Sequence, residues 1–175
     1  MKGADGRPEP SPWLLEWLPR LEGPVLDLAC GRGRNARAVW AAGLPLLGID
    51  RDPDALRELV AAAPGVLAVR ADLEARDVIP LRPGAFGAVL VFRYLHRPLL
   101  PAIEALLRPG GWLLYETFTV AQRALGRGPR SPAFLLEPGE LRQSFPGLLV
   151  EGFEEGLSAG ERPEALARLA ARRPD

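Results

Sequence analysis

Residues 25–35 read VLDLACGRGRN, a short apolar run that contains one aspartate and leads into a turn with two glycines. The run 25–29 is typical of a buried strand, and residues 35–42 are typical of a helix that Gly43 ends. Glycines at such a turn allow positive φ and let a ligand approach the backbone closely. Ligands of open α/β sheets lie at the carboxyl ends of the strands. The stretch therefore predicts a strand, a turn and a helix, with a ligand over residues 29–33.

On both sides of this stretch, apolar runs alternate with amphipathic segments. Further strands are expected at 44–49, 66–69, 86–92, 112–118 and 148–154, and helices at 12–21, 53–63, 98–108 and 138–145. The Pro-Gly-Gly sequence at 109–111 predicts a turn, and 119–136 is expected to be irregular. Strands that alternate with helices indicate βαβ units and a parallel sheet. Because the strands are continuously apolar, both faces of that sheet should be covered.

The composition indicates one domain with a substantial core. The chain has 175 residues, of which 47% are hydrophobic. Residues 1–12 are polar and rich in proline, which predicts a flexible N-terminal segment before a single domain at 13–175. That segment has no apolar core, so it does not read as a signal peptide.

The same composition argues against several classes of partner. Lys and Arg total 22 and Asp and Glu total 22, so no net charge attracts nucleic acid or an anionic membrane. No apolar run approaches the roughly 20 residues that span a bilayer. Cys30 is the only cysteine, which excludes an intramolecular disulfide and a multi-cysteine zinc site. We expect a cytoplasmic protein without nucleic-acid, membrane or metal partners, and the sequence does not indicate its oligomeric state.

Acidic residues follow or lie within three successive predicted strands. Asp27 lies in the first strand, Asp50 ends the second, 19 positions after Gly31, and Asp72 follows the third. A carboxylate at the end of the second strand can accept both hydroxyl protons of a ribose, and Asp72 can accept from an adenine amino group. The negative charge of these acids would repel a pyrophosphate. The three acids together predict a pocket for a nucleoside without phosphates.

These motifs resemble those of class I S-adenosylmethionine-dependent methyltransferases. The resemblance covers about residues 25–172 and rests on the segments 25–35, 48–56, 71–73, 86–92 and 107–114. It implies a doubly wound, mostly parallel, seven-stranded Rossmann-like α/β sheet with an antiparallel last strand and helices on both faces. The tail 164–172 favours a helix on propensity, whereas the resemblance implies a strand.

A closer likeness is to methyltransferases of the tellurite-resistance type. It rests on Gly-Arg-Asn at 33–35, on Phe134 with Gly-Glu-Leu at 139–141, and on Ala-Ala-Arg-Arg at 170–173. The hairpin 156–163 lacks the histidine that members of this group can carry, so the likeness does not extend to tellurite or selenite as substrate.

The resemblance implies that S-adenosylmethionine binds at the glycine turn and leaves as S-adenosylhomocysteine. Asp27 is a candidate for holding the amine of this methyl donor or for orienting the turn, and both readings stay open. The residues implied to bind the donor are Asp27, Ala29, Cys30, Gly31, Gly33, Asn35, Asp50, Arg51, Asp72, Leu73 and Phe92.

The methyl acceptor is expected above the fourth and fifth strands and, given the small chain, to be a small molecule. Arg93, Tyr94 and His96 follow the fourth strand and are the candidate catalytic residues. His96 is the only histidine, and its side chain is the only one with an ordinary pKa near neutrality, so it can act as a general base or bind an anion.

Two other readings of the glycine turn compete with methyl transfer. Gly31, Gly33 and Ala36, with Asp50 about 20 residues on, match the dinucleotide fingerprint of an NAD-dependent oxidoreductase. The chain after this unit, however, has no second domain for a hydride acceptor, and Asp27 favours the sulfonium donor. The third reading is a non-catalytic S-adenosylmethionine-binding protein, since no acid–base constellation stands out in the sequence.

Overall fold

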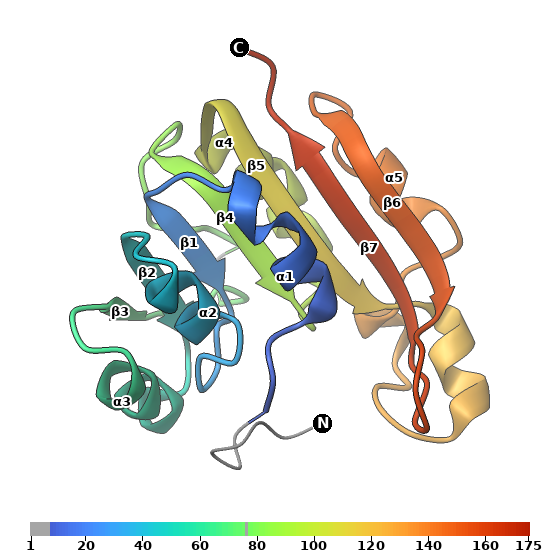
Figure 1. Ribbon diagram of the computed structural model, residues 1–175. Helices are drawn as coiled ribbons and strands as arrows, with labels where there is room; N and C mark the ends of the chain where they lie inside the picture. Colours follow the sequence, from blue (N-terminus) through green and yellow to red (C-terminus); the bar gives the residue numbers. More distant parts are fainter. Residues whose placement is uncertain (1–7, 76) are drawn as a thin grey trace.

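A computed structural model describes residues 8–75 and 77–175 (Figure 1). Its centre is a seven-stranded sheet in the order β3-β2-β1-β4-β5-β7-β6. The strands are β1 (Val25–Leu28), β2 (Leu46–Asp50), β3 (Leu67–Arg70), β4 (Phe86–Phe92), β5 (Leu107–Phe118), β6 (Leu149–Leu157) and β7 (Ala165–Arg172). The first five pair in parallel, and β7 runs antiparallel to both β5 and β6. The predicted fold class is confirmed, and the tail is the strand β7.

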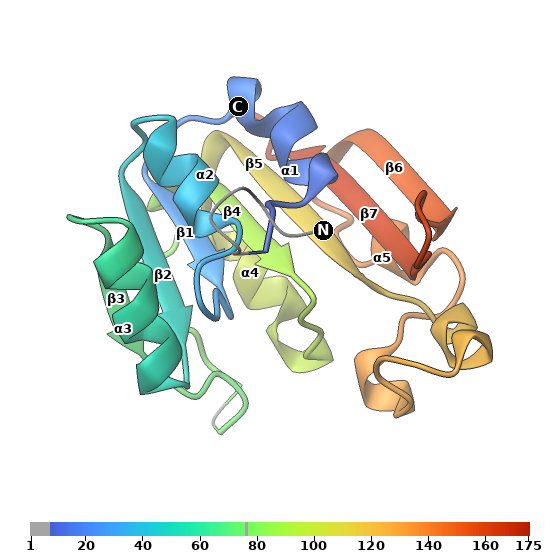
Figure 2. The ribbon, with the colours of Figure 1, turned by 60° about the horizontal axis from the view of Figure 1, so that its bottom comes forward.

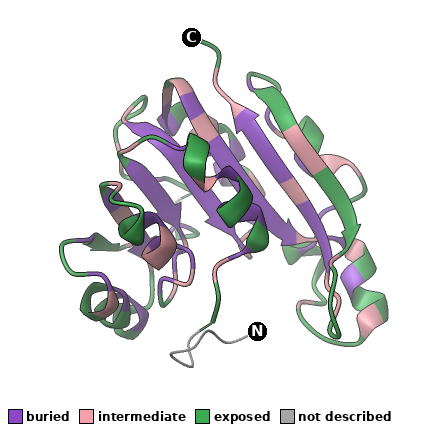
Figure 3. Ribbon diagram, in the orientation of Figure 1, coloured by how far each residue is buried: buried purple, intermediate pink, exposed green. Residues whose placement is uncertain are grey.

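Helices cover both faces of the sheet (Figure 1). The helices are α1 (Pro12–Trp17), α2 (Ala36–Ala41), α3 (Pro53–Ala62), α4 (Leu100–Leu106) and α5 (Glu140–Gln143), with 3-10 turns η1 (Leu18–Arg20), η2 (Arg97–Leu99), η3 (Val120–Leu125) and η4 (Pro132–Phe134). The apolar residues of α1, α2 and α3 pack on one face and those of α4 and α5 on the other. The inner strands β1, β4 and β7 are almost entirely buried between these two cores, which accounts for their apolar sequences, whereas the edge strands β3 and β6 are largely exposed (Figure 3).

The expected turn at 109–111 is wrong, because this segment is part of the long strand β5. Gly110 adopts φ +70°, and the pairing of β5 with β4 shifts register between Phe86 and Ala88. Backbone hydrogen bonds of Gly110 and Gly111 with Arg173, beyond the end of β7, keep the segment extended. The glycines therefore form a bulge inside the strand.

The expected helix at 12–21 changes to a 3-10 turn after Trp17. Pro19 lies in this turn and lacks the N–H that would continue an α-helix. Ser11 precedes the helix as expected but does not cap it, because its hydroxyl donates to Glu116 Oε2 at 2.9 Å. Of the N-terminal segment 1–12, residues 1–7 lie outside the described residues, whereas Ser11 is 1% exposed.

The carboxyl ends of the parallel strands meet at one edge of the sheet. Figure 2 shows β1 and β4 side by side there, with α2 and α4 on opposite faces. The helix α3 begins at this edge as predicted, since the carboxylate of Asp52 accepts from the backbone N–H groups of Asp54 and Ala55. Among the described residues, no helix has the length and apolar character that a bilayer span requires.

Candidate functional site

The turn after β1 is built on left-handed backbone. Ala29, Gly31 and Gly33 have φ of 53°, 52° and 76°. The N–H of Gly31 donates to Asp50 Oδ2 at 2.7 Å, and the N–H of Cys30 donates to the carbonyl of Ile49 at 3.0 Å. These bonds fix the turn against the end of β2, so the carboxylate of Asp50 lies directly beside it.

The two glycines of the turn are needed for different reasons. A Cβ on Gly33 would lie 2.4 Å from Cδ1 of Leu59, whereas nothing lies within 4 Å of a Cβ on Gly31. Gly33 therefore allows α3 to pack against the turn, and Gly31 leaves open space above it.

Alanine at these two positions should consequently have unequal effects on stability. We expect Gly33→Ala to lower the free energy of unfolding by roughly 2–4 kcal/mol, from left-handed strain together with overpacking against Leu59. Gly31→Ala has only the strain and should lose about 1–2 kcal/mol. Urea unfolding of both variants measures the difference, and equal losses would contradict this account of Gly33.

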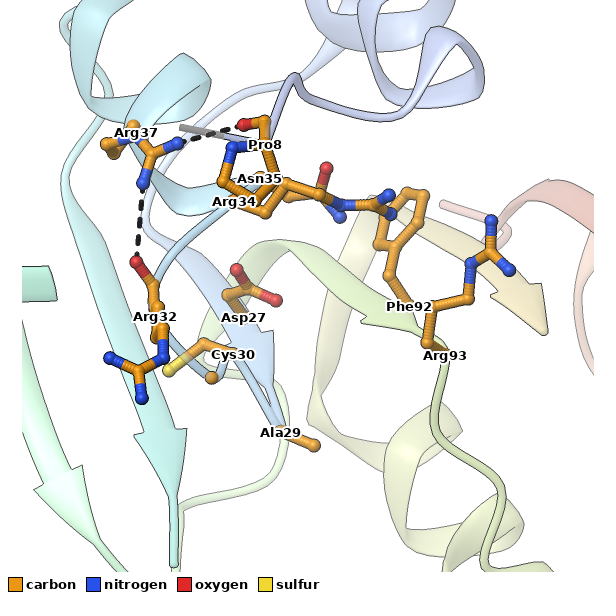
Figure 4. A pocket seen from close by; sticks show the side chains of 11 residues that line it. Pro8, Asp27, Ala29, Cys30, Arg32, Arg34, Asn35, Arg37, Phe92 and Arg93 are labelled. Atoms are coloured by element: carbon orange, nitrogen blue, oxygen red, sulfur yellow. Dashed lines mark hydrogen bonds between the residues drawn. The ribbon is translucent and has the colours of Figure 1, made fainter. Parts of the chain in front are cut away.

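A cavity of about 210 Å³ opens between the turn and the end of β4, and we call it the Asp27 cavity (Figure 4). Its lining combines the turn, the start of α2 and the end of β4. The lining residues are Pro8, Asp27, Ala29, Cys30, Gly31, Arg32, Arg34, Asn35, Arg37, Phe92 and Arg93.

Asp27 is the acidic group of this cavity. It is 2% exposed, and its Oδ2 is buried without a hydrogen-bond partner among the described residues. Burial raises the pKa of the carboxyl from 3.8 to about 7, against the attraction of Arg34, while Asp50 raises it further. A buried carboxylate with a free oxygen is suited to a cationic ligand.

A second cavity, the Asp50 cavity, lies on the other side of Ala29 and has a volume of about 120 Å³. It is lined by Ala29, Asp50, Arg51, Ala71, Asp72, Leu73, Glu74 and Tyr94. Ala29 lines both cavities, so they adjoin at the turn. The two cavities between them contain the three acids that the sequence pattern singled out.

Tyr94, which follows β4, lines the Asp50 cavity. Its hydroxyl is buried without a partner among the described residues, and burial raises the pKa of this phenol. The hydroxyl of Tyr115 donates to the backbone carbonyl of Tyr94 at 3.0 Å and holds the segment after β4 in place. Tyr94 therefore faces the same space as Asp50 and Asp72.

A buried ionic cluster lies beside the Asp27 cavity, and sequence reasoning did not find it. Glu116, 1% exposed on β5, accepts hydrogen bonds from Ser11 Oγ and from Arg168 Nε, both at 2.9 Å. Arg93 Nε lies 3.4 Å and Arg34 Nη2 lies 3.8 Å from its other oxygen. A charged residue inside an apolar strand was the only signal in the sequence, because its partners come from distant segments.

Most of the predicted site residues come together in these two cavities. Gly33 and His96 line neither of them. His96 Nε2 lies 2.5 Å from Oδ1 of Asp77, in the segment between β3 and β4. Asn35 lines the Asp27 cavity, and its side chain accepts from the backbone N–H of Ser11 at 2.9 Å. For Cys30, burial raises the thiol pKa, so it lines the cavity as a neutral group.

Comparison with known proteins gives matches in sequence and in structure. Residues 25–111 match the methyltransferase domain family. The trans-aconitate 2-methyltransferase of Rhizobium meliloti is 37% identical over 120 residues, which are 66% of this chain and 46% of that protein. The chain thus spans less than half the length of the first curated relatives it matches.

Two solved structures share the fold over most of the chain. An S-adenosylmethionine-dependent methyltransferase from Mesorhizobium loti has a TM-score of 0.75 at 23% identity, covering 93% of this chain and 96% of that one. TehB from Haemophilus influenzae has a TM-score of 0.74 at 14% identity, covering 92% and 61%.

Proposed function

Because the chain belongs to the class I S-adenosylmethionine-dependent methyltransferases, we propose that it transfers a methyl group from S-adenosylmethionine to a small-molecule acceptor. The observation that carries this proposal is the pair of cavities that meet at Ala29. One is lined by the carboxylates expected for a nucleoside. The other contains the buried oxygen of Asp27, which no described residue contacts by a hydrogen bond. The name of the Rhizobium relative, which acts on trans-aconitate, supports a small molecule as acceptor.

The Asp50 cavity suits the adenosine part of the donor. Asp50 accepts one backbone N–H on each oxygen, from Gly31 and from Asp52. A carboxylate offers about four acceptor sites, so about two remain for the hydroxyls of a ribose. Asp72 and Leu73, further along the same wall, are the residues that we assign to the adenine.

The Asp27 cavity suits the amino-acid part of the donor. The free oxygen of Asp27 can accept from an ammonium group, and Arg34, in the same lining, can donate to a carboxylate. Burial lowers the pKa of the Arg34 guanidinium, and its Nη2 has no hydrogen-bond partner among the described residues. A zwitterion would satisfy both groups at once.

The bound donor supplies a sulfonium, an excellent leaving group for the methyl carbon. The side chains of the site need mainly to hold donor and acceptor in line. Such positioning lowers the activation barrier by about 7–11 kcal/mol in favourable systems. Ala29 lies between the two cavities, Phe92 lines the Asp27 cavity, and strand β1, paired with β2 and β4, fixes the position of Asp27.

The affinity for the donor should depend on pH through Asp27. An ammonium requires the ionised carboxylate, and the carboxyl pKa is about 7. The association constant of S-adenosylmethionine should therefore fall by up to about tenfold for each pH unit below 7 and level off above it. Calorimetric titrations between pH 5 and 8.5 measure this, and an association constant independent of pH would contradict the assignment of Asp27.

The proposal is tested by calorimetric titration of the purified chain with S-adenosylmethionine and, separately, with NAD. We expect saturable one-to-one binding of the sulfonium compound and much weaker binding of NAD, because a pyrophosphate would lie against Asp27 and Asp50. Tight binding of NAD without binding of S-adenosylmethionine would favour an oxidoreductase. Donor binding without methylation of any acceptor would favour a non-catalytic role.

A further inference from the structure

The Asp27 cavity is lined by four arginines and a single acidic residue. Two of the arginines already make polar contacts with other groups. Arg32 pairs with Glu58 on α3, and Arg37 donates to the carbonyl of Pro8 at 3.0 Å. The other two arginines of the lining both face the buried carboxylate of Glu116.

These two arginines, Arg34 and Arg93, come from different elements, and their guanidinium groups lie 3.8 and 3.4 Å from the same oxygen of Glu116. Arg34 belongs to the glycine turn, and Arg93 directly follows β4 (Figure 4). The zwitterionic end of the donor accounts for one carboxylate, which we have assigned to Arg34. Arg93 is left for a different anion.

The backbone of Arg93 is strained where it borders the cavity. It adopts φ 61°, a left-handed conformation that is unfavourable for a residue with a side chain. The hydrogen bond from its N–H to the carbonyl of Glu116, 2.8 Å long, holds it there. Strain that neighbouring structure maintains is typical of functional positions.

The guanidinium of Arg93 is held by an aromatic ring and by an ion pair through one of its nitrogens. It lies 4.5 Å from the centre of the Phe118 ring, and its Nη2 lies 2.5 Å from Glu164 Oε2. Its Nε faces Glu116, yet it makes no hydrogen bond among the described residues. Glu116 also pairs with Arg168, so its negative charge is divided among three arginines. A quarter of the Arg93 side chain is exposed, and the residue lines the cavity.

We propose that the methyl acceptor is an organic carboxylate, that Arg93 binds it, and that it is methylated on oxygen. This inference rests on the proposed methyl transfer and adds the class of acceptor. The carbon skeleton of such an acceptor would contact Phe92, in the same wall of the cavity.

The chemistry of the cavity agrees with an acceptor that is already ionised. Apart from the arginines, its titratable lining groups are Asp27, which the donor uses, and Cys30, whose thiol is held neutral by burial. A carboxylate needs no base at neutral pH. One of its oxygen lone pairs forms the new O–CH₃ bond while the S–CH₃ bond breaks and its electron pair stays on sulfur. The products are a methyl ester and S-adenosylhomocysteine, and no proton has to be removed.

Acid and amide pairs of probes test this class of acceptor. The purified chain is incubated with methyl-labelled S-adenosylmethionine and with benzoate, trans-cinnamate or fumarate, each paired with its amide. Methyl esters release labelled methanol in mild alkali, whereas methyl ethers and N-methyl products do not. We expect alkali-labile label from the acids only. Label that withstands alkali, equal labelling of the amides, or no labelled acid while the donor binds would overturn the proposal.

The variant Arg93→Met tests the assigned residue. Loss of a charged hydrogen-bonding pair should raise the KM for the labelled acid roughly 10- to 100-fold and leave the Kd of S-adenosylmethionine within about twofold. The control is Arg142→Met on α5, because the Arg142 guanidinium also lies over a phenylalanine ring, at 5.8 Å, but outside the cavity. An unchanged KM in Arg93→Met would refute the role of Arg93.

The donor Kd separates the failure of this inference from the failure of the proposed function. Wild-type protein that binds S-adenosylmethionine but esterifies no acid would refute only the acceptor class. Protein that does not bind the donor would refute the proposed function itself. Thermal unfolding of Arg93→Met shows whether the variant is folded, and the acid and amide pairs test the class of acceptor without any variant.

Discussion

Asparagine at position 50 should weaken binding of S-adenosylmethionine about 100-fold, because a charged acceptor of two ribose hydroxyls becomes a neutral amide with one acceptor oxygen. Hydrogen bonds to charged groups contribute about 1.5–3 kcal/mol each, and 100-fold corresponds to about 2.7 kcal/mol. The amide can keep one of the two backbone bonds that Asp50 accepts, from Gly31 or from Asp52. Calorimetry at pH 8 measures the loss.

The matched control for Asp50→Asn is Asp54→Asn. Asp54 lies four residues further along, in the first turn of α3, where it is exposed and pairs with Arg57. Its substitution removes the same charge from the same region without touching the Asp50 cavity. We expect the donor Kd of this control to stay within about twofold of wild type, because exposed ion pairs are worth little. Equal Kd values for Asp50→Asn and wild type would refute the assignment of the ribose to Asp50.

Asparagine at position 27 should stabilise the protein and at the same time weaken donor binding. Burial raises the pKa of the Asp27 carboxyl to about 7, so its ionised form is disfavoured in the folded state. The unfolded chain ionises near the ordinary value of 3.8, so folding stability falls as pH rises from about 4 to 7. The Asp27→Asn variant lacks this destabilising contribution, which is on the order of 4 kcal/mol above pH 7 and vanishes below about pH 4.

Urea unfolding at pH 4 and pH 8, together with donor titration at pH 8, measures both effects of Asp27→Asn. The stabilisation should appear at pH 8 and be absent at pH 4, and the donor Kd should rise at least about tenfold because the ammonium loses its anionic partner. A variant that is destabilised at pH 8 would show that the Asp27 carboxylate supports the fold by bonds within the turn. That result would favour the reading of Asp27 as a residue that only orients the turn.

The fold was largely predictable because most of its strands are marked locally. The run 86–92 is apolar throughout and lies between Gly84 and Arg93, and β4 has the bounds of this run. The tail 165–172 was ambiguous, since its alanines and leucines favour a helix, and pairing with β5 and β6 overrides that propensity. The bulge at 109–111 could not be predicted, because contacts with Arg173, more than 60 residues away, hold it extended.

The site was predictable where the chain itself brings residues together. Asp27, Asp50 and Asp72 follow from the rule that ligands bind at the carboxyl ends of parallel strands, and they line the two cavities. The cluster around Glu116 joins residues from distant segments, so no spacing in the sequence indicates it. The general-base role of His96 stays a prediction, and its ring is engaged by Asp77.

The cavity geometry also explains why Arg93 and Tyr94, neighbours in sequence, should serve different ligands. The left-handed backbone of Arg93 directs the two side chains to different cavities. Tyr94 closes the space that we assign to adenosine, and Arg93 reaches the space that we assign to the acceptor. One strained residue thus separates the two halves of the site.

The central claim is that the two cavities on either side of Ala29 hold one molecule of the methyl donor. A crystal structure of the chain grown with S-adenosylhomocysteine tests it most directly. We expect the ribose hydroxyls within hydrogen-bond distance of the Asp50 carboxylate and the amino group within that distance of Asp27. Density for the nucleoside at any other place on the sheet, or crystals that show both cavities empty at saturating ligand, would contradict the claim.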